Sequence, residues 1–340
     1  MSAGREAIER RLSAVYPEVR QAHSDVALPM RAGGARPLER ITALSVGEPA
    51  HWLYVSQGLS ELHEKKSKRA DRSGWGLELT FRLKRGKQPK APDWPFALLQ
   101  GLAAFVFQHR SPFAAGGQMD LNGPVRADAA TAQSAVVFRE DSKLGKIETP
   151  FGAVQFLQVV PVHAAELAAC EAWSSAGVLG VLARRDPELV TDLARPSLFK
   201  DPALAAEVEQ GIAREGSSLG TVVMDSLEWS REGDGVVLRV GAHAAESLAG
   251  MLAGRTLHGR RVVIEGAAGM AIVDAGPAPA WRVEDRALVL TLSEAAARAV
   301  QARLLPRRGA HTFPELAGFR LEIMPSEIRD PEGKVLRTVG

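Results

Sequence analysis

The chain has 340 residues, and its 42 Lys and Arg against 40 Asp and Glu leave a net charge of +2. This length exceeds the span of one hydrophobic core, so it predicts two domains. The near balance of charge argues against a nucleic-acid partner. The single cysteine, Cys170, excludes a disulfide bond within the chain and is typical of a reducing compartment.

The chain also lacks the patterns of export and of membrane insertion. Its first residues, "MSAGREAIERRL", are charged and contain no apolar core, so we expect no signal peptide. A membrane helix needs about 18 to 20 apolar residues. The longest candidate, residues 151–165, is interrupted by Gln155, Gln158 and Pro161. The sequence therefore predicts a cytoplasmic protein without a membrane partner.

Hydrophobic periodicity predicts helices and strands in the first 225 residues. Residues 5–15 have helical spacing, residues 51–62 indicate a strand and a turn, and residues 77–83 alternate with the period of a half-buried strand. A helix is expected from about residue 93 to 110, followed by a loop over 111–134. After that loop we expect a strand–turn–strand over 146–162, a helix over 164–184, a strand over 188–193 and a helix over 202–214.

The stretch "SREGDG", residues 230–235, is the most linker-like part of the chain, because it is polar and contains two glycines. We therefore expect an α+β protein of two domains, each a mixed β-sheet flanked by helices, covering residues 1–225 and 236–340. In the second domain we expect strands over 236–240, 260–264, 270–273, 287–292 and 318–324, and helices over 244–253 and 293–304.

The stretch "SGWGLELTFRLK" raises a local question, because Gly74 and Gly76 flank Trp75 directly before a strand. Such a pair allows a bend or a close approach of another chain segment. It is not a phosphate loop, because it precedes a strand and lacks the further glycine or the Lys-Ser/Thr pair of such loops. The apolar faces predict five core residues: Trp75, Phe81, Phe96, Leu99 and Phe156.

No motif for catalysis or metal binding stands out. The eight histidines form no H-E-x-x-H pattern, so we expect no metal site. Ser218 lies in "GSSLG", but a nucleophile elbow needs a strand before it and a helix after it, and here that order is inverted. Cys170 is interpreted as a buried, inert thiol. The sequence predicts no catalytic residue and no cofactor, and it favours a binding protein over an enzyme.

The order and spacing of several blocks resemble the suppressor of fused family. The blocks are "HWLYVSQGLSEL", "SGWGLELTFRLKR", "WPFALLQGLAAFVFQ" and "TPFGAVQFLQVV", and the likeness runs over residues 5–222. The blocks "LAGRTLHGRRV" and "FPELAGFRLEIMPSEIRDP" resemble the family's C-terminal domain. The resemblance implies a non-enzymatic protein that grips a short peptide between its two domains as an added β-strand.

The resemblance also implies partner-binding positions. The family's cleft aromatics match Phe105 and Phe113, although for Phe105 packing in the core is an equal alternative. The family's acidic residues, which anchor a histidine of the peptide, fall on Gly117 and near His243. Since both carboxylates are replaced, we expect the animal-type peptide to lose its charge partners and the groove to prefer an apolar or acidic peptide.

The resemblance leaves the partner open. The alanine-, arginine- and glycine-rich composition is typical of a high-GC bacterium. For bacterial relatives the family context suggests an immunity protein that neutralises a toxin domain. The competing hypotheses are a housekeeping scaffold or regulator of a cytosolic protein, and an uncharacterised hydrolase. A toxin gene alongside would favour immunity, and a convergent acid, base and nucleophile would favour the hydrolase.

Overall fold

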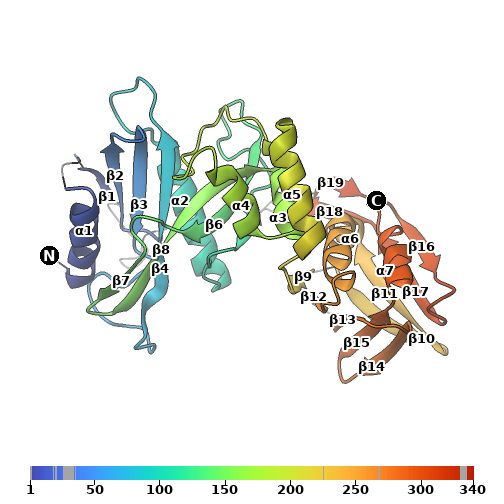
Figure 1. Cartoon of the computed structure of the whole chain (residues 1–340). Helices are drawn as coiled ribbons and strands as arrows, with labels where there is room; N and C mark the ends of the chain where they lie inside the picture. The colour runs from blue at the N-terminus through green and yellow to red at the C-terminus, as the bar shows by residue number, and fades with distance from the viewer. Residues whose placement is uncertain are drawn as a thin grey trace. The chain divides into compact units, whose positions relative to one another are not determined.

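The computed structural model describes residues 2–17, 19, 21–25, 34, 36–224, 226–266, 269–329 and 335–340 (Figure 1). Its contacts divide the chain into two compact units. The first unit contains residues 1–167 and 179–201, and the second contains residues 168–178 and 202–340. Both units combine helices with mixed sheets, which confirms the predicted α+β class.

The first unit is built on an eight-stranded sheet in the order β1-β2-β3-β4-β8-β6-β5, with β7 paired to β8. Only β4 and β8 pair in parallel, and the other pairs are antiparallel. The strands are β1 (Gln21–Asp25), β2 (Arg40–Val46), β3 (His51–Gln57), β4 (Arg72–Lys84), β5 (Gln118–Asp120), β6 (Gln133–Glu140), β7 (Lys146–Thr149) and β8 (Gly152–His163).

Both faces of this sheet are buried, each against one helix. Helix α1 (Ala3–Val15) packs Ile8 and Leu12 against one face, where Leu53 and Phe156 lie. Helix α2 (Trp94–His109) packs its apolar stripe against the other face, which carries Phe81. Burial on both sides explains why β3 is buried at all seven positions instead of alternating.

Three of the five predicted core residues are fully buried, namely Phe81, Leu99 and Phe156. Trp75 and Phe96 pack against the same core but are only half-buried, so for these two the prediction holds in part. Trp75 lies where the register of β4 on β8 shifts between Arg72 and Leu77, so strand alternation does not hold there. Phe96 lies in the first turn of α2 and contacts the ring of Tyr54 edge-on.

The remaining elements before residue 220 are helical. They are α3 (Ala164–Ala172), α4 (Ser175–Ala183), the short 3₁₀ helix η2 (Leu198–Lys200) and α5 (Pro202–Glu215). The strand predicted over 188–193 is absent, and that region contributes a single bridge from Thr191 to Leu83. The loop predicted over 111–134 contains β5 and the start of β6.

The second unit contains two sheets and a separate hairpin. One sheet has the order β10-β11-β17-β16, with β10 (Glu228–Glu232), β11 (Gly235–Gly241), β16 (Gly309–Thr312) and β17 (Phe319–Met324). The other has the order β14-β15-β13-β12-β9, with β9 (Thr221–Val223), β12 (Val262–Gly266), β13 (Gly269–Ala275), β14 (Ala280–Glu284) and β15 (Ala287–Leu292). The hairpin pairs β18 (Ser326–Arg329) with β19 (Val335–Val339).

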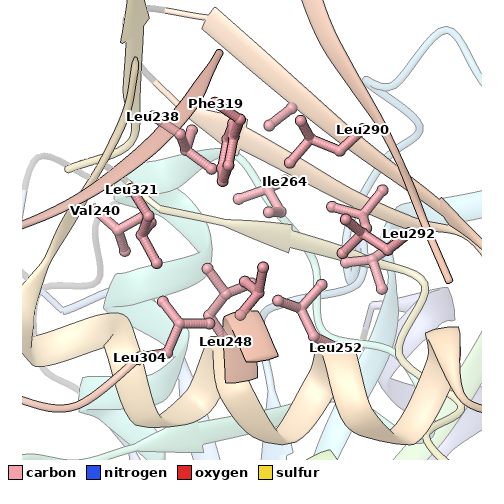
Figure 2. Close-up of a cluster of buried hydrophobic side chains, with 14 of the residues drawn as sticks. Leu238, Val240, Leu248, Leu252, Ile264, Leu290, Leu292, Leu304, Phe319 and Leu321 are labelled. Atoms are coloured by element: carbon pink, nitrogen blue, oxygen red, sulfur yellow. The ribbon is translucent and has the colours of Figure 1, made fainter. Parts of the chain in front are cut away.

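Two helices, α6 (Ala242–Thr256) and α7 (Glu294–Gln301), complete the core of this unit. Figure 2 shows Leu248 and Leu252 of α6 facing side chains from both sheets. Leu238 and Phe319 come from the first of these sheets, and Ile264 comes from the second. The unit therefore has one hydrophobic core shared by its two sheets.

The segment interpreted as a linker, residues 230–235, is part of this unit. Strand β10 pairs antiparallel with β11 up to Glu232 and Gly235, so Gly233 and Asp234 form a two-residue hairpin connection. The linker interpretation of "SREGDG" is wrong, because polar residues and glycines also suit a hairpin turn. Contacts group residues 202–225 with the second unit, whereas the domain limits 1–225 and 236–340 stay a prediction.

Candidate functional site

The glycine pair around Trp75 forms a bulge in β4 that brings in the loop after β3. Gly74 and Gly76 have φ angles of 56° and 80°, which favour glycine. The Trp75 backbone N–H donates to the Leu59 carbonyl at 2.9 Å. A Cβ atom at Gly74 would lie 2.7 Å from the same carbonyl oxygen, so a larger residue does not fit there. The pair therefore serves the close approach of two chain segments.

A buried carboxylate accepts hydrogen bonds from the backbone of the same loop. Glu78, on β4, accepts hydrogen bonds from the backbone N–H groups of Gly58 and Ser60, both at 2.9 Å, and from the hydroxyls of Ser56 and Ser60. Burial raises the pKa of the Glu78 carboxyl above its usual value, and these donors oppose that shift. The carboxylate is thus part of the loop's framework.

The loop and the bulge border a pocket of about 270 Å³. Trp75 and Phe107 form its apolar wall, with ring centroids 5.6 Å apart and an edge-on arrangement. On its polar side His63 Nε2 lies 2.8 Å from Glu39, a carboxylate that Arg5 also contacts at 3.2 Å. Sequence reasoning missed this pocket, because its lining comes from segments that only the fold brings together.

The predicted aromatic residues form a stack of rings at the C-terminal end of α2. Phe105 stacks on His109 at 4.0 Å and on Phe113 at 5.8 Å, and Phe113 stacks on Phe138 of β6 at 4.1 Å between ring centroids. Arg110, with a φ angle of 53°, ends the helix and turns the chain toward Phe113. We call these four side chains (Phe105, His109, Phe113 and Phe138) the ring stack.

The ring stack runs from the core toward solvent. Phe138 is fully buried, Phe105 and Phe113 are half-buried, and His109 is exposed. Phe113 packs against the core that α2 covers. Phe105 therefore presents apolar ring surface to solvent and is not a fully buried core residue, in contrast to the alternative weighed for it.

Gly117 lies beside the ring stack and leads into β5. Its N–H donates to the Ala114 carbonyl at 2.9 Å, and its carbonyl accepts from the Phe138 N–H at 2.8 Å. β5 ends the strand order of its sheet, so its second edge faces no other strand of the described chain. The structure thus brings Phe105, Phe113 and Gly117 together at one end of a sheet.

His243, the fourth predicted position, lies in the second unit. It is exposed in the first turn of α6, and its backbone N–H donates to the Ser326 hydroxyl at 3.2 Å. The second unit also has a three-residue end strand, β9, with Val223 70% exposed. Both units therefore contain a sheet that ends on a strand of three residues, β5 in the first and β9 in the second.

The residues considered as nucleophiles or metal ligands form no catalytic or metal-binding arrangement among the described residues. Ser218 follows α5 and precedes β9, which is the reverse of the order that a nucleophile elbow needs. Cys170 is buried in α3. Among the described residues, no group of three or more His, Cys, Asp or Glu side chains is arranged to hold a metal ion. None of the described helices has the length and apolar character to cross a membrane.

The fold and this surface define a two-unit α+β protein with aromatic residues beside an end strand. The crystal structure of Drosophila Suppressor of Fused has the same fold, with a TM-score of 0.80 over 95% of this chain and 97% of that chain, at 21% identity. A chain from the crystal structure of the Sufu-Fu complex matches 61% of this chain and 98% of its own length, with a TM-score of 0.57 and 28% identity.

The sequence comparisons agree with the fold. The family model "Suppressor of fused protein (SUFU)" matches residues 34–196. The human Suppressor of fused homolog is 36% identical over 238 residues, 62% of this chain and 49% of the relative, and the mouse homolog is 35% identical over the same shares. The chain is therefore similar to suppressor of fused proteins in sequence and in fold, and it spans about half the length of the curated relatives it matches.

Proposed function

We propose that the chain is a non-enzymatic protein-binding module that captures a peptide or protein segment at the ring stack and at the edge of β5. The observation that carries the proposal is the half-exposed Phe105 and Phe113 beside an end strand. Aromatic rings contribute much of the binding energy at protein interfaces. An end strand offers backbone hydrogen bonds to an added strand.

The comparisons support a binding role. The matched chain comes from the crystal structure of the Sufu-Fu complex, and it aligns with 61% of this chain at 28% identity. The partner of this chain is a separate question. The family context of bacterial relatives makes a toxin domain the first partner to test, with a host scaffold or regulatory target as the alternative outcome.

The test is capture of partners from a lysate of the native host by the full chain, followed by mass spectrometry. The wild-type chain is compared with a double variant, Phe105→Ala/Phe113→Ala, and with Phe151→Ala. Phe151 is a matched control, since it is also half-buried in this unit but lies on the turn between β7 and β8. We expect a protein that the wild type and the control retain and the double variant loses.

Two results would count against the proposal. If the double variant retains the same partner at the same yield, the ring stack is not the binding surface. If the captured protein is turned over, the non-enzymatic assignment is wrong. A captured protein that arrests growth when expressed alone, and is neutralised by this chain, would identify a toxin.

His243, which lies in the second unit, is the fourth proposed partner-binding residue. Its assignment rests only on the family resemblance. Since its side chain is exposed, His243→Ala is expected to leave the fold intact. Reduced capture by this variant would support the assignment, and unchanged capture would remove His243 from the site.

A further inference from the structure

The turn after α7 leads into β16 in the second unit (Figure 1), and these two segments carry a basic corner. It consists of Arg303, Arg307, Arg308 and His311, and we use the name for these four residues. The three arginines are exposed and His311 is half-buried. Leu304, which is 1% exposed, anchors the segment in the core. Backbone hydrogen bonds from Leu305 to Arg303 and from Arg307 to Leu305, at 3.0 and 2.7 Å, hold the turn compact.

The charges of this corner are not compensated within the described chain. Elsewhere in the second unit arginines pair with carboxylates, as Arg239 does with Glu322, Arg261 with Asp274 and Arg320 with Glu232. In the part of the chain that the structure describes, no guanidinium of the basic corner forms such a pair. Three cations within six residues therefore concentrate positive potential at one place.

This positive potential affects the pKa of His311. Its partial burial and the nearby guanidinium groups of Arg303 and Arg307 lower the pKa of its imidazole below the usual value. The guanidinium groups of Arg303 and Arg307 thus act on the His311 imidazole of β16. An anion bound at this corner would relieve that repulsion.

The basic corner borders the end of a sheet. β16 ends the order β10-β11-β17-β16, so its second edge faces no other strand of the described residues. Leu305 is 39% exposed beside it. Arginines at an end strand commonly prevent sheets from joining one another. The same arrangement selects a strand that carries negative charge, because charge complementarity governs which partner docks.

We propose that the basic corner and the edge of β16 dock an acidic, extended segment of a protein partner. The strand edge supplies backbone hydrogen bonds, and Arg303, Arg307 and Arg308 pair with carboxylates, with the bidentate geometry that guanidinium groups allow. Leu305 contacts an apolar side chain of the segment. This surface uses none of Phe105, Phe113 and Gly117, so it goes beyond the proposed function and fails independently of it.

The test uses the full chain and a fluorescent peptide of alternating Glu and Val, about eight residues long to match an ordinary strand. Binding is followed by anisotropy. We expect saturable binding at about 50 mM salt that weakens strongly at about 300 mM, where charges are screened. Arg307→Glu should weaken binding by about tenfold or more. Arg286→Glu is the matched control, an exposed arginine on the β14–β15 turn of the same unit, and should change it less than about twofold.

Several outcomes would overturn the proposal. These are no saturable binding at low salt, equal weakening by Arg307→Glu and Arg286→Glu, or equal binding of a peptide of alternating Lys and Val. Tighter binding of a single-stranded DNA oligonucleotide, lost in Arg307→Glu, would assign the corner to nucleic acid instead. The double variant Phe105→Ala/Phe113→Ala should bind the acidic peptide as the wild type does.

Discussion

Phe81 and Phe105 show how differently two phenylalanines of one unit contribute. Phe81 is fully buried between β4 and α2, whereas Phe105 is half-buried and outside the core. We expect Phe81→Ala to lower the free energy of unfolding by about 3–5 kcal/mol, because it leaves a cavity. Phe105→Ala should cost less than about 2 kcal/mol. Urea denaturation of both variants checks this, and equal costs would show that Phe105 is a core residue.

A substitution at Gly117 tests directly whether the missing carboxylate weakens the binding of a histidine-bearing peptide. A Cβ atom there would lie 3.0 Å from the Ala114 carbonyl oxygen, so a side chain requires a small local shift. We expect a histidine-bearing peptide of the animal type to bind weakly to the wild type. Gly117→Asp should tighten binding by about tenfold, because it returns a charge partner.

Gly117→Ala is the control for that measurement, since it adds the same Cβ atom without the charge. Calorimetry of the three proteins separates the two effects. Tight binding by the wild type, unchanged in Gly117→Asp, would refute the argument that the missing carboxylate matters.

At the scale of elements, the bulge in β4 makes a prediction about backbone strain. Gly74→Ala should destabilise the protein by about 1–3 kcal/mol, because a left-handed φ angle and the Leu59 carbonyl both oppose a side chain. Gly101, exposed within α2, has nothing within 4 Å of an added Cβ atom. Gly101→Ala should therefore stabilise by up to about 1 kcal/mol. Thermal unfolding of the two variants checks this. A change in stability of the same sign in Gly74→Ala and Gly101→Ala would contradict the prediction.

The elements also show what sequence patterns capture. Residues 77–83 fall inside β4, and the strand–turn–strand over 146–162 matches β7 and β8. All seven residues 77–83 are buried, so the half-buried character that their alternation predicted is wrong. β5 and β16 have only three and four residues, too few for a period to appear. These two end strands therefore escaped prediction, although they border both proposed docking surfaces.

The ring stack and the pocket at Trp75 were predictable only in part, because their residues come from distant segments of the chain. Phe105 and Phe113 are close in sequence, and the family resemblance indicated both. Phe138, on which Phe113 stacks, comes from β6, a strand that the periodicity did not predict. The pocket at Trp75 depends on contacts among α2, β4 and the loop after β3. Such long-range pairs are set by the fold and leave no local pattern.

At the scale of the whole molecule, buried carboxylates set the response to acid. Burial alone would raise the pKa values of Asp141 and Glu166, but the guanidinium groups of Arg82 and Arg195, with further hydrogen bonds, lower both below their usual values. A carboxyl group whose folded-state pKa is depressed stabilises the fold above its unfolded-state pKa. That contribution is lost as the pH falls through the folded-state value.

We therefore expect the contribution of these two carboxylates to the unfolding free energy to be steady from neutral pH to about pH 5 and to fall below about pH 4. Glu78 contributes in the opposite sense, since burial raises its pKa and its stabilising contribution is lost as the pH rises. Urea denaturation over this pH range tests the balance. A free energy that stays constant or increases on acidification below pH 4 would contradict the contribution of the two ion pairs.

The central claim is that a partner binds at the ring stack and the edge of β5. Hydrogen–deuterium exchange of the full chain, with and without the captured partner, tests it most directly, because a bound strand protects backbone N–H groups. The account predicts that protection on binding is centred on residues 105–120. Protection confined to other segments, or a tight complex without any change over 105–120, would contradict it.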